Sequence, residues 1–149
     1  MDRFFRGFTA GVVGGILMQI WSFFSFHVLN FTKLRFMDWA AIIVFGEQAE
    51  TILEAIFALF AHLLFSGFLG LVFAFLLPQV TSRLYLLKGV IFGIIVGFFI
   101  YAIPVLLQTP RLNQATLGTA MTDHIGGVIW GLATAYTLAR LSRREELLP

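Results

Sequence analysis

Three polar side chains stand inside long apolar stretches of this 149-residue sequence, at spacings that place them at a similar depth. Gln19 lies twelve residues after Gly7, and Tyr101 lies twelve residues after Gly89, which is about 18 Å along a helix in each case. His62 lies ten residues after Ile52, which is about 15 Å from the start of its own stretch. Because this stretch runs in the opposite direction, that start lies at the other end of the helices. We therefore expect a midplane polar layer of Gln19, His62 and Tyr101. It would serve as interhelical hydrogen bonds or, in the alternative interpretation, as a proton relay or a polar ligand site.

A second set of titratable side chains lies near one common end of the expected helices, which we call the outer end. Its three glutamates follow one another at helical spacings of three and four residues. Carboxylates and imidazoles can hold a divalent cation, although neither HExxH nor ExxH is present. The alternative is a solvated acidic helix start, which the positive end of the helix dipole stabilises. This outer cluster consists of His27, Glu47, Glu50, Glu54, Asp123 and His124.

The histidines also raise the question of haem, which needs two imidazoles at one depth on facing helices. His27 and His124 both lie near the outer ends of their helices, whereas His62 lies deeper. The sequence shows no nucleophile–base arrangement, no phosphate-binding glycine loop and no cysteine. We therefore expect a non-enzymatic protein without a cofactor, with haem or a divalent cation as the alternatives.

Composition indicates the surroundings in which these residues act. Hydrophobic residues make up 59% of the chain and charged residues only 12%, against about 25% charged residues in an average soluble domain. A soluble domain of this length has too little interior to bury so much apolar surface. We therefore exclude an ordinary soluble enzyme, a disordered tail and a nucleic-acid-binding module. The composition predicts an integral membrane protein, with lipid as a partner and no nucleic acid.

Four apolar stretches predict four membrane-spanning helices. The first three reach the roughly 20 residues that a helix needs to cross the hydrocarbon core. The fourth is uncharged over only 16 residues, so it must begin near Gly118 and include Asp123 and His124. We expect an all-α fold, a four-helix antiparallel bundle forming a single domain over residues 1–149. Its spans are residues 7–29, 52–77, 86–107 and 118–139.

Residues 36–46 form a fifth, shorter apolar segment that ends at Gly46. Ten residues of helix reach only about 15 Å, which is too short to cross a bilayer. We expect an interfacial helix on the outer surface. A re-entrant segment, or an extension of the second span kinked at Gly46, is the alternative.

The lysines and arginines predict the orientation, since cytoplasmic loops are enriched in both residues. Seven lie on the side that holds both termini and three lie on the other side. We therefore expect a protein of the cytoplasmic membrane with both termini in the cytoplasm. The seven are Arg3, Arg6, Arg83, Lys88, Arg140, Arg143 and Arg144, and the three are Lys33, Arg35 and Arg111.

Glycines recur every four residues in the expected spans. Small residues at this spacing allow membrane helices to approach closely, so we predict helix-packing contacts there. The first and third spans share one pattern with an offset of 82 residues, and the second and fourth share another with an offset of 61. This similarity predicts a duplicated helical hairpin with both copies in the same orientation. The packing positions are Gly7, Gly11, Gly15, Gly70, Gly89, Gly93, Gly97, Gly127 and Gly131.

The order of features resembles that of a known group of proteins. The sequence has a glycine-rich first span with Trp21, an Asn-Phe-Thr exit at residues 30–32, and a glycine-rich fourth span around Trp130. In these features the whole chain resembles small four-helix membrane proteins of spore-forming bacteria. That family has no established activity, so the resemblance implies a topology and no function.

Three classes of function follow from these observations. We expect a small structural or accessory subunit that packs through its glycine rows into a homo-oligomer or a larger membrane complex. The first alternative is a small oligomeric transporter or ion or proton conductor that uses the His62 layer. The second alternative is a haem- or quinone-binding redox subunit.

Overall fold

The chain folds into helices that match the apolar stretches of the sequence. A computed structural model describes residues 2–79, 84–113 and 116–145, with side chains described for all of these except residues 79 and 143–145. All regular secondary structure in these residues is helical, which confirms the all-α prediction. The elements are α1 (Arg3–His27), α2 (Phe36–Phe45), α3 (Ile52–Leu76), the short 3-10 helix η1 (Leu77–Gln79), α4 (Tyr85–Leu106) and α5 (Leu117–Glu145).

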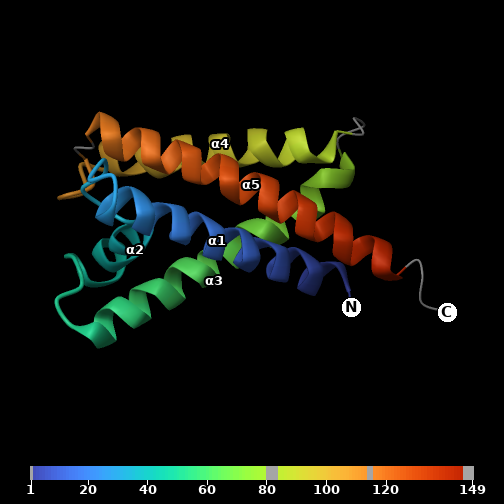
Figure 1. The fold of residues 1–149 in the computed structure, drawn as a ribbon, viewed down its shortest axis with the longest axis horizontal. Coiled ribbons are helices and arrows are strands. Elements are labelled where there is room, and N and C mark those ends of the chain that lie inside the picture. The colour runs from blue at the N-terminus through green and yellow to red at the C-terminus, as the bar shows by residue number, and fades with distance from the viewer. Residues whose placement is uncertain (1, 80–83, 114–115, 146–149) are drawn as a thin grey trace.

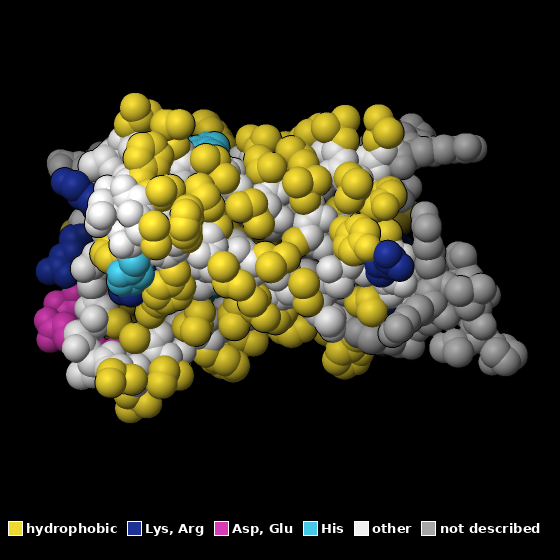
Figure 2. Space-filling view, viewed as in Figure 1, with side chains coloured by type: hydrophobic (Ala, Val, Ile, Leu, Met, Phe, Trp, Pro, Cys, Tyr) yellow, Lys and Arg dark blue, Asp and Glu magenta, His cyan; other side chains and the backbone are white. Residues whose placement is uncertain are grey.

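Three of the four expected spans are apolar enough to cross a membrane by their own composition. These are α1, α3 and α4. With 29 residues α5 is also long enough, but its polar side chains keep it out of that class. Several of them, including Thr119, Thr122 and Thr134, are buried inside the protein. Figure 2 shows hydrophobic side chains over the middle of the molecule, with the charged side chains at its two ends.

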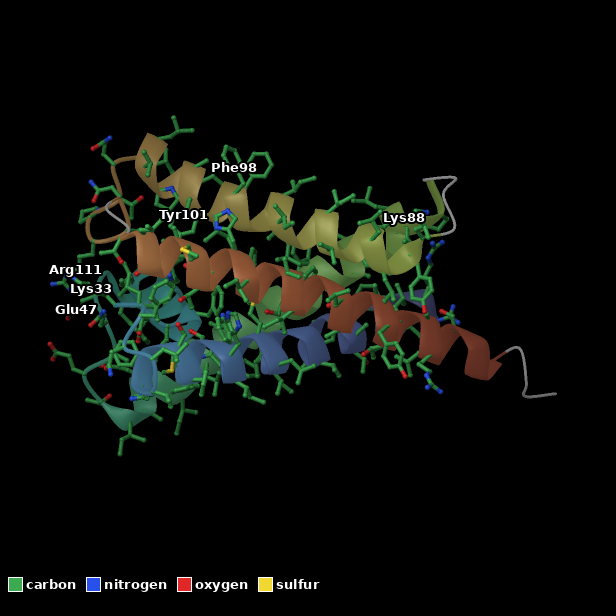
Figure 3. All side chains as sticks on the ribbon, turned by 45° about the horizontal axis from the view of Figure 1, so that its top comes forward. Lys33, Glu47, Lys88, Phe98, Tyr101 and Arg111 are labelled. Carbon is green, nitrogen blue, oxygen red and sulfur yellow. The ribbon has the colours of Figure 1, made fainter. Side chains whose placement is uncertain are left out.

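The long helices run antiparallel, so that α1 begins and α5 ends at the same end of the molecule (Figure 1). We call this the terminal end; Lys88 lies there, whereas Lys33, Glu47 and Arg111 lie at the opposite end, the α2 end (Figure 3). Helix α1 packs against α3 and α5, and α4 packs against α5. Among the described residues, α3 and α4 form no extended contact. The bundle is therefore open on the side between α3 and α4.

Glycines bring α1 and α3 into backbone contact. A Cβ atom on Gly7 would lie 2.7 Å from the Cβ of Ala74 and 3.0 Å from the carbonyl oxygen of Gly70. A Cβ on Gly11 would overlap the carbonyl oxygen of Ser66 and lie 2.8 Å from the Cα of Gly70. Only glycine fits at these positions without moving the helices apart.

The contact between α4 and α5 repeats this pattern. A Cβ on Gly89 would lie 2.7 Å from the Cβ of Ala135 and would overlap the carbonyl oxygen of Gly131. A Cβ on Gly93 would overlap the carbonyl oxygen of Gly127. The two helix pairs therefore share equivalent contacts at the offsets of 82 and 61 residues that the sequence suggested. The equivalent pairs are Gly7–Ala74 with Gly89–Ala135, and Gly11–Ser66 with Gly93–Gly127.

The remaining two sides of the bundle are not equivalent. Gly14 of α1 allows Trp130 of α5 to approach, and a Cβ there would lie 2.9 Å from the indole. At the matching position α4 carries Val96. One turn earlier on α4, the ring of Phe92 contacts that of Phe73 on α3 at a centroid distance of 5.4 Å. Larger side chains therefore hold α3 and α4 apart where small ones let α1 and α5 meet.

Helix α2 is a separate helix that packs against α3 at the α2 end. Its first turn is closed by an ion pair of 2.8 Å between Arg35 and Asp38, and Asp38 also accepts a hydrogen bond from the backbone N–H of Arg35. It ends, as predicted, at Gly46, whose φ of 82° favours glycine. Of its ten residues, six are buried. It therefore forms part of the packed interior rather than continuing α3.

Candidate functional site

A cavity of about 550 Å³ lies on the open side of the bundle between α3 and α4. The walls are Leu69 of α3, Val96 and Gly97 of α4, and Trp130 of α5, and Trp39 of α2 also lines it. A Cβ on Gly97 would have no atom within 4 Å, so this glycine faces open space. The lining is almost wholly apolar, and the volume is in the range of small-molecule binding sites.

Asp123 is one of two ionisable residues that line the cavity. It is buried, with only 3% of its surface exposed, and its Oδ2 accepts a hydrogen bond of 2.6 Å from the hydroxyl group of Tyr101. The indole of Trp39 lies near the same carboxyl group. Neither the indole nitrogen nor the Oδ1 atom of Asp123 has a partner at hydrogen-bonding geometry. Asp123 therefore brings a buried carboxyl oxygen without a partner to the wall of the cavity.

His62 is the other ionisable residue in the lining, on the α3 wall. It is 7% exposed, and its ring stacks on that of Phe36 at a centroid distance of 5.7 Å. The imidazole is hydrogen-bonded to the backbone of Gly15, while its Nε2 atom has no partner. His62 and Asp123 occupy matching positions in the two hairpins, since they are separated by the offset of 61 residues.

The structure distributes the expected midplane layer over separate contacts. Tyr101 bonds to Asp123, and His62 bonds to the backbone of Gly15. Gln19 is buried, and neither its amide nitrogen nor its amide oxygen has a hydrogen-bond partner. Among the described residues, no hydrogen bond joins Gln19, His62 and Tyr101 to one another. What the fold brings together instead is Tyr101 with Asp123, next to a cavity that His62 also lines.

The outer cluster is likewise dispersed. Glu47 forms an ion pair of 3.8 Å with Arg111, and Glu54 closes a capping box with Thr51 at the start of α3. The side chain of Glu54 also accepts a hydrogen bond from the backbone N–H of Glu50. Within the described part of the chain, no three His, Asp or Glu side chains are grouped so that they could hold a metal ion. The contacts of Glu54 are those of an acidic helix start.

Each histidine stacks on a different aromatic ring. His27 is exposed at the α2 end and stacks on Phe23 at 5.8 Å, while His124 stacks on Tyr101 at 5.7 Å. The third, His62, stacks on the ring from α2 described above. None of these contacts pairs two histidines, which is the arrangement that bis-histidine haem ligation requires.

Sequence reasoning did not identify the polar contacts between α1 and α5 near the α2 end. The hydroxyl groups of Ser25 and Thr122 lie 2.7 Å apart, and the indole of Trp21 donates to the carbonyl of Thr122. A further bond joins α1 to α2, since the backbone N–H of Phe36 donates to the hydroxyl of Ser22. The available signal was the spacing of three residues between Ser22 and Ser25 on an otherwise apolar helix.

Comparison with protein-family models, curated proteins and solved structures finds no match for this chain. The resemblance to small membrane proteins of spore-forming bacteria therefore stays a prediction. What the protein does must be inferred from the cavity, its lining and the helices around it.

Proposed function

We propose that this chain is an integral membrane protein that binds a small amphipathic molecule in the cavity between α3 and α4. The observation that carries the proposal is an apolar cavity of about 550 Å³ whose lining includes two buried ionisable side chains with unpartnered atoms, His62 and Asp123. Binding sites for small molecules combine apolar walls with a few placed polar groups in this way. The role is binding rather than catalysis.

In this proposal α5 is the fourth membrane-spanning helix, and both termini lie in the cytoplasm. The burial of its polar side chains inside the bundle supports the crossing. Lys88 lies at the terminal end (Figure 3), in agreement with an excess of basic residues on the cytoplasmic side. Arg83 lies outside the described residues, as do the side chains of Arg143 and Arg144.

The other classes of function receive less support from the contacts. Apart from Gly97, which faces the cavity, the glycines that suggested an accessory subunit make their close contacts within the chain, so they offer little surface to a partner. A proton conductor using the His62 layer would need polar side chains in sequence, yet the described hydrogen bonds do not connect His62 with Gln19 or Tyr101. Bis-histidine haem binding would need two facing histidines, and in the described ring contacts no histidine faces another.

A cavity-filling variant tests the proposal. Gly97→Phe places a ring in the cavity, because a side chain at Gly97 meets no neighbouring atom. A matched control is Phe98→Leu on the next residue, which is 62% exposed and points away from the bundle (Figure 3). Both variants are reconstituted in phosphatidylcholine nanodiscs with the wild-type protein.

The readout is tryptophan fluorescence, because Trp39 and Trp130 line the cavity. A single-chain amphiphile with brominated carbons quenches a tryptophan that it contacts. We expect a saturable component of quenching in the wild type and in Phe98→Leu, and its loss in Gly97→Phe. Quenching that never saturates in the wild type, or that saturates equally in Gly97→Phe, would overturn the proposal.

A further inference from the structure

We infer that the molecule held in this cavity carries a hydrogen-bond-donating, cationic head group, such as a primary ammonium, which binds at Asp123. This inference rests on the proposed function and names the class of its ligand. It follows from which atoms of the lining lack partners and from where the positive charges of the protein lie.

The surroundings of Asp123 are those of a hydrogen-bond acceptor. The Tyr101 hydroxyl donates to its Oδ2 atom, and the second neighbour, the indole of Trp39, is a group that only donates. Opposite a bound cation the carboxyl group would be ionised, and an ionised carboxylate accepts through both oxygens. The Oδ1 atom of Asp123 is buried and has no partner at hydrogen-bonding geometry, so it can accept from a donor that enters the cavity once the lining shifts to admit it.

His62 provides a second acceptor. Gly15 lies inside α1, where its single N–H donates to the helix. Its carbonyl oxygen has two lone pairs and can accept a second hydrogen bond. The backbone group that bonds to the imidazole is therefore this carbonyl, and the ring nitrogen donates to it. In a neutral imidazole with one nitrogen donating, the other nitrogen is an acceptor. The unpartnered Nε2 atom of His62 is therefore also suited to a donor.

The backbone of α4 also has a carbonyl that lacks its usual helical donor. Pro104 lies inside α4 and lines the cavity, and proline has no N–H to donate to the carbonyl four residues earlier. That carbonyl belongs to Ile100, which also lines the cavity. Among the described side chains of the lining, the two unpartnered acceptors, Asp123 Oδ1 and His62 Nε2, thus outnumber the one unpartnered donor, the Trp39 indole.

The charges favour a cation over a neutral donor. None of the described residues that line the cavity is a lysine or an arginine, and Arg35, at the start of α2, is paired with Asp38. A buried carboxylate without a positive partner is costly in a membrane. An ammonium head supplies the missing charge, while the hydrocarbon chain of the same molecule occupies the apolar walls.

The test compares head groups at constant chain length. Four brominated single-chain amphiphiles carry an ammonium, a hydroxyl, a methyl ketone or a carboxylate, and the Kd of each is taken from saturable tryptophan quenching in phosphatidylcholine nanodiscs. We expect the ammonium compound to bind at least about tenfold more tightly than the ketone and the carboxylate, with the hydroxyl compound between them. Gly97→Phe serves as the control for partition into the lipid.

A variant then locates the preference. Asp123→Asn retains a side chain of the same shape and an acceptor oxygen but loses the charge, so the ammonium advantage over the hydroxyl compound should disappear. If Asp123→Asn does not fold, the comparison of head groups in the wild type still decides. Equal Kd values for all four compounds, or tighter binding of the ketone, would overturn this inference while leaving the proposed function intact. Absence of saturable quenching by every compound would overturn both.

Discussion

Replacing Gly93 with alanine should force α4 away from α5, whereas the same replacement at Gly97, one helical turn further on, should not. A Cβ on Gly93 would overlap the carbonyl oxygen of Gly127 and lie 2.9 Å from its carbonyl carbon. Both are backbone atoms, so only displacement of a helix relieves the overlap. A Cβ on Gly97 meets no atom within 4 Å.

The expected magnitudes follow from these two environments. Overpacking of a tight contact costs about 1–3 kcal/mol of unfolding free energy. Glycine to alanine in a helix contributes about 0.8–1 kcal/mol of stability at both positions, so this effect cancels in the comparison. We therefore expect Gly93→Ala to be less stable than Gly97→Ala by about 1–3 kcal/mol, with Gly97→Ala at or above the stability of the wild type.

Reversible unfolding in mixed micelles measures the difference. The fraction of SDS is raised stepwise, helix content is followed by circular dichroism, and the free energy of unfolding is extrapolated to zero SDS. A difference between the two variants below about 0.5 kcal/mol, the range of ordinary surface substitutions, would show that the contact between Gly93 and α5 is not formed.

Three further predictions concern other parts of the chain. Tyr101→Phe keeps the ring but removes the hydroxyl that donates to Asp123, so the free energy of unfolding should fall by about 1–3 kcal/mol; unchanged stability in the same SDS titration would contradict this hydrogen bond. Thr51→Ala removes the N-cap of α3 and should cost about 1 kcal/mol, and a loss below the error of that titration would argue against the cap. Because the chain has no cysteine, single cysteines at Ser142 and Asn113 report topology, and maleimide should label them only from the cytoplasm and only from outside, respectively. Labelling of both from one side would refute the four-span proposal; a cysteine at residue 82, the other natural cytoplasmic reporter, falls outside the described residues.

The helices were predictable because apolar length and charge determine them almost alone. Four long runs and one short run became the five α-helices, and Gly46 ended α2 because it takes a left-handed conformation there. The pairing of helices was also partly readable. The rows around Gly11 and Gly93 repeat at one offset, and their contacts on α3 and α5 repeat at the other.

The candidate site was less predictable, because spacing along a helix gives depth but not the direction in which a side chain points. Gln19, His62 and Tyr101 have comparable depths. Tyr101 bonds to Asp123 and His62 to the backbone of Gly15, however, and Gln19 has no hydrogen-bond partner. The pairing of Tyr101 with Asp123 depends on which helices are adjacent. The cavity arises because α4 carries larger side chains where α1 carries small ones, as at Val96 against Gly14. This difference becomes visible only when the two hairpins are aligned position by position.

The polar inner face of α5 has a consequence for how the protein is made. The hydroxyl of Thr122 pairs with that of Ser25 on α1, and one carboxyl oxygen of Asp123 accepts from Tyr101 of α4, so these groups of α5 find their partners only after the earlier helices are in place. Because α5 follows these helices in the sequence and is the least apolar of the four long ones, the burial of its polar side chains depends on them. Helix α1 thus acts as a folding template for α5, and losing α1 would leave Thr122 without its partner Ser25.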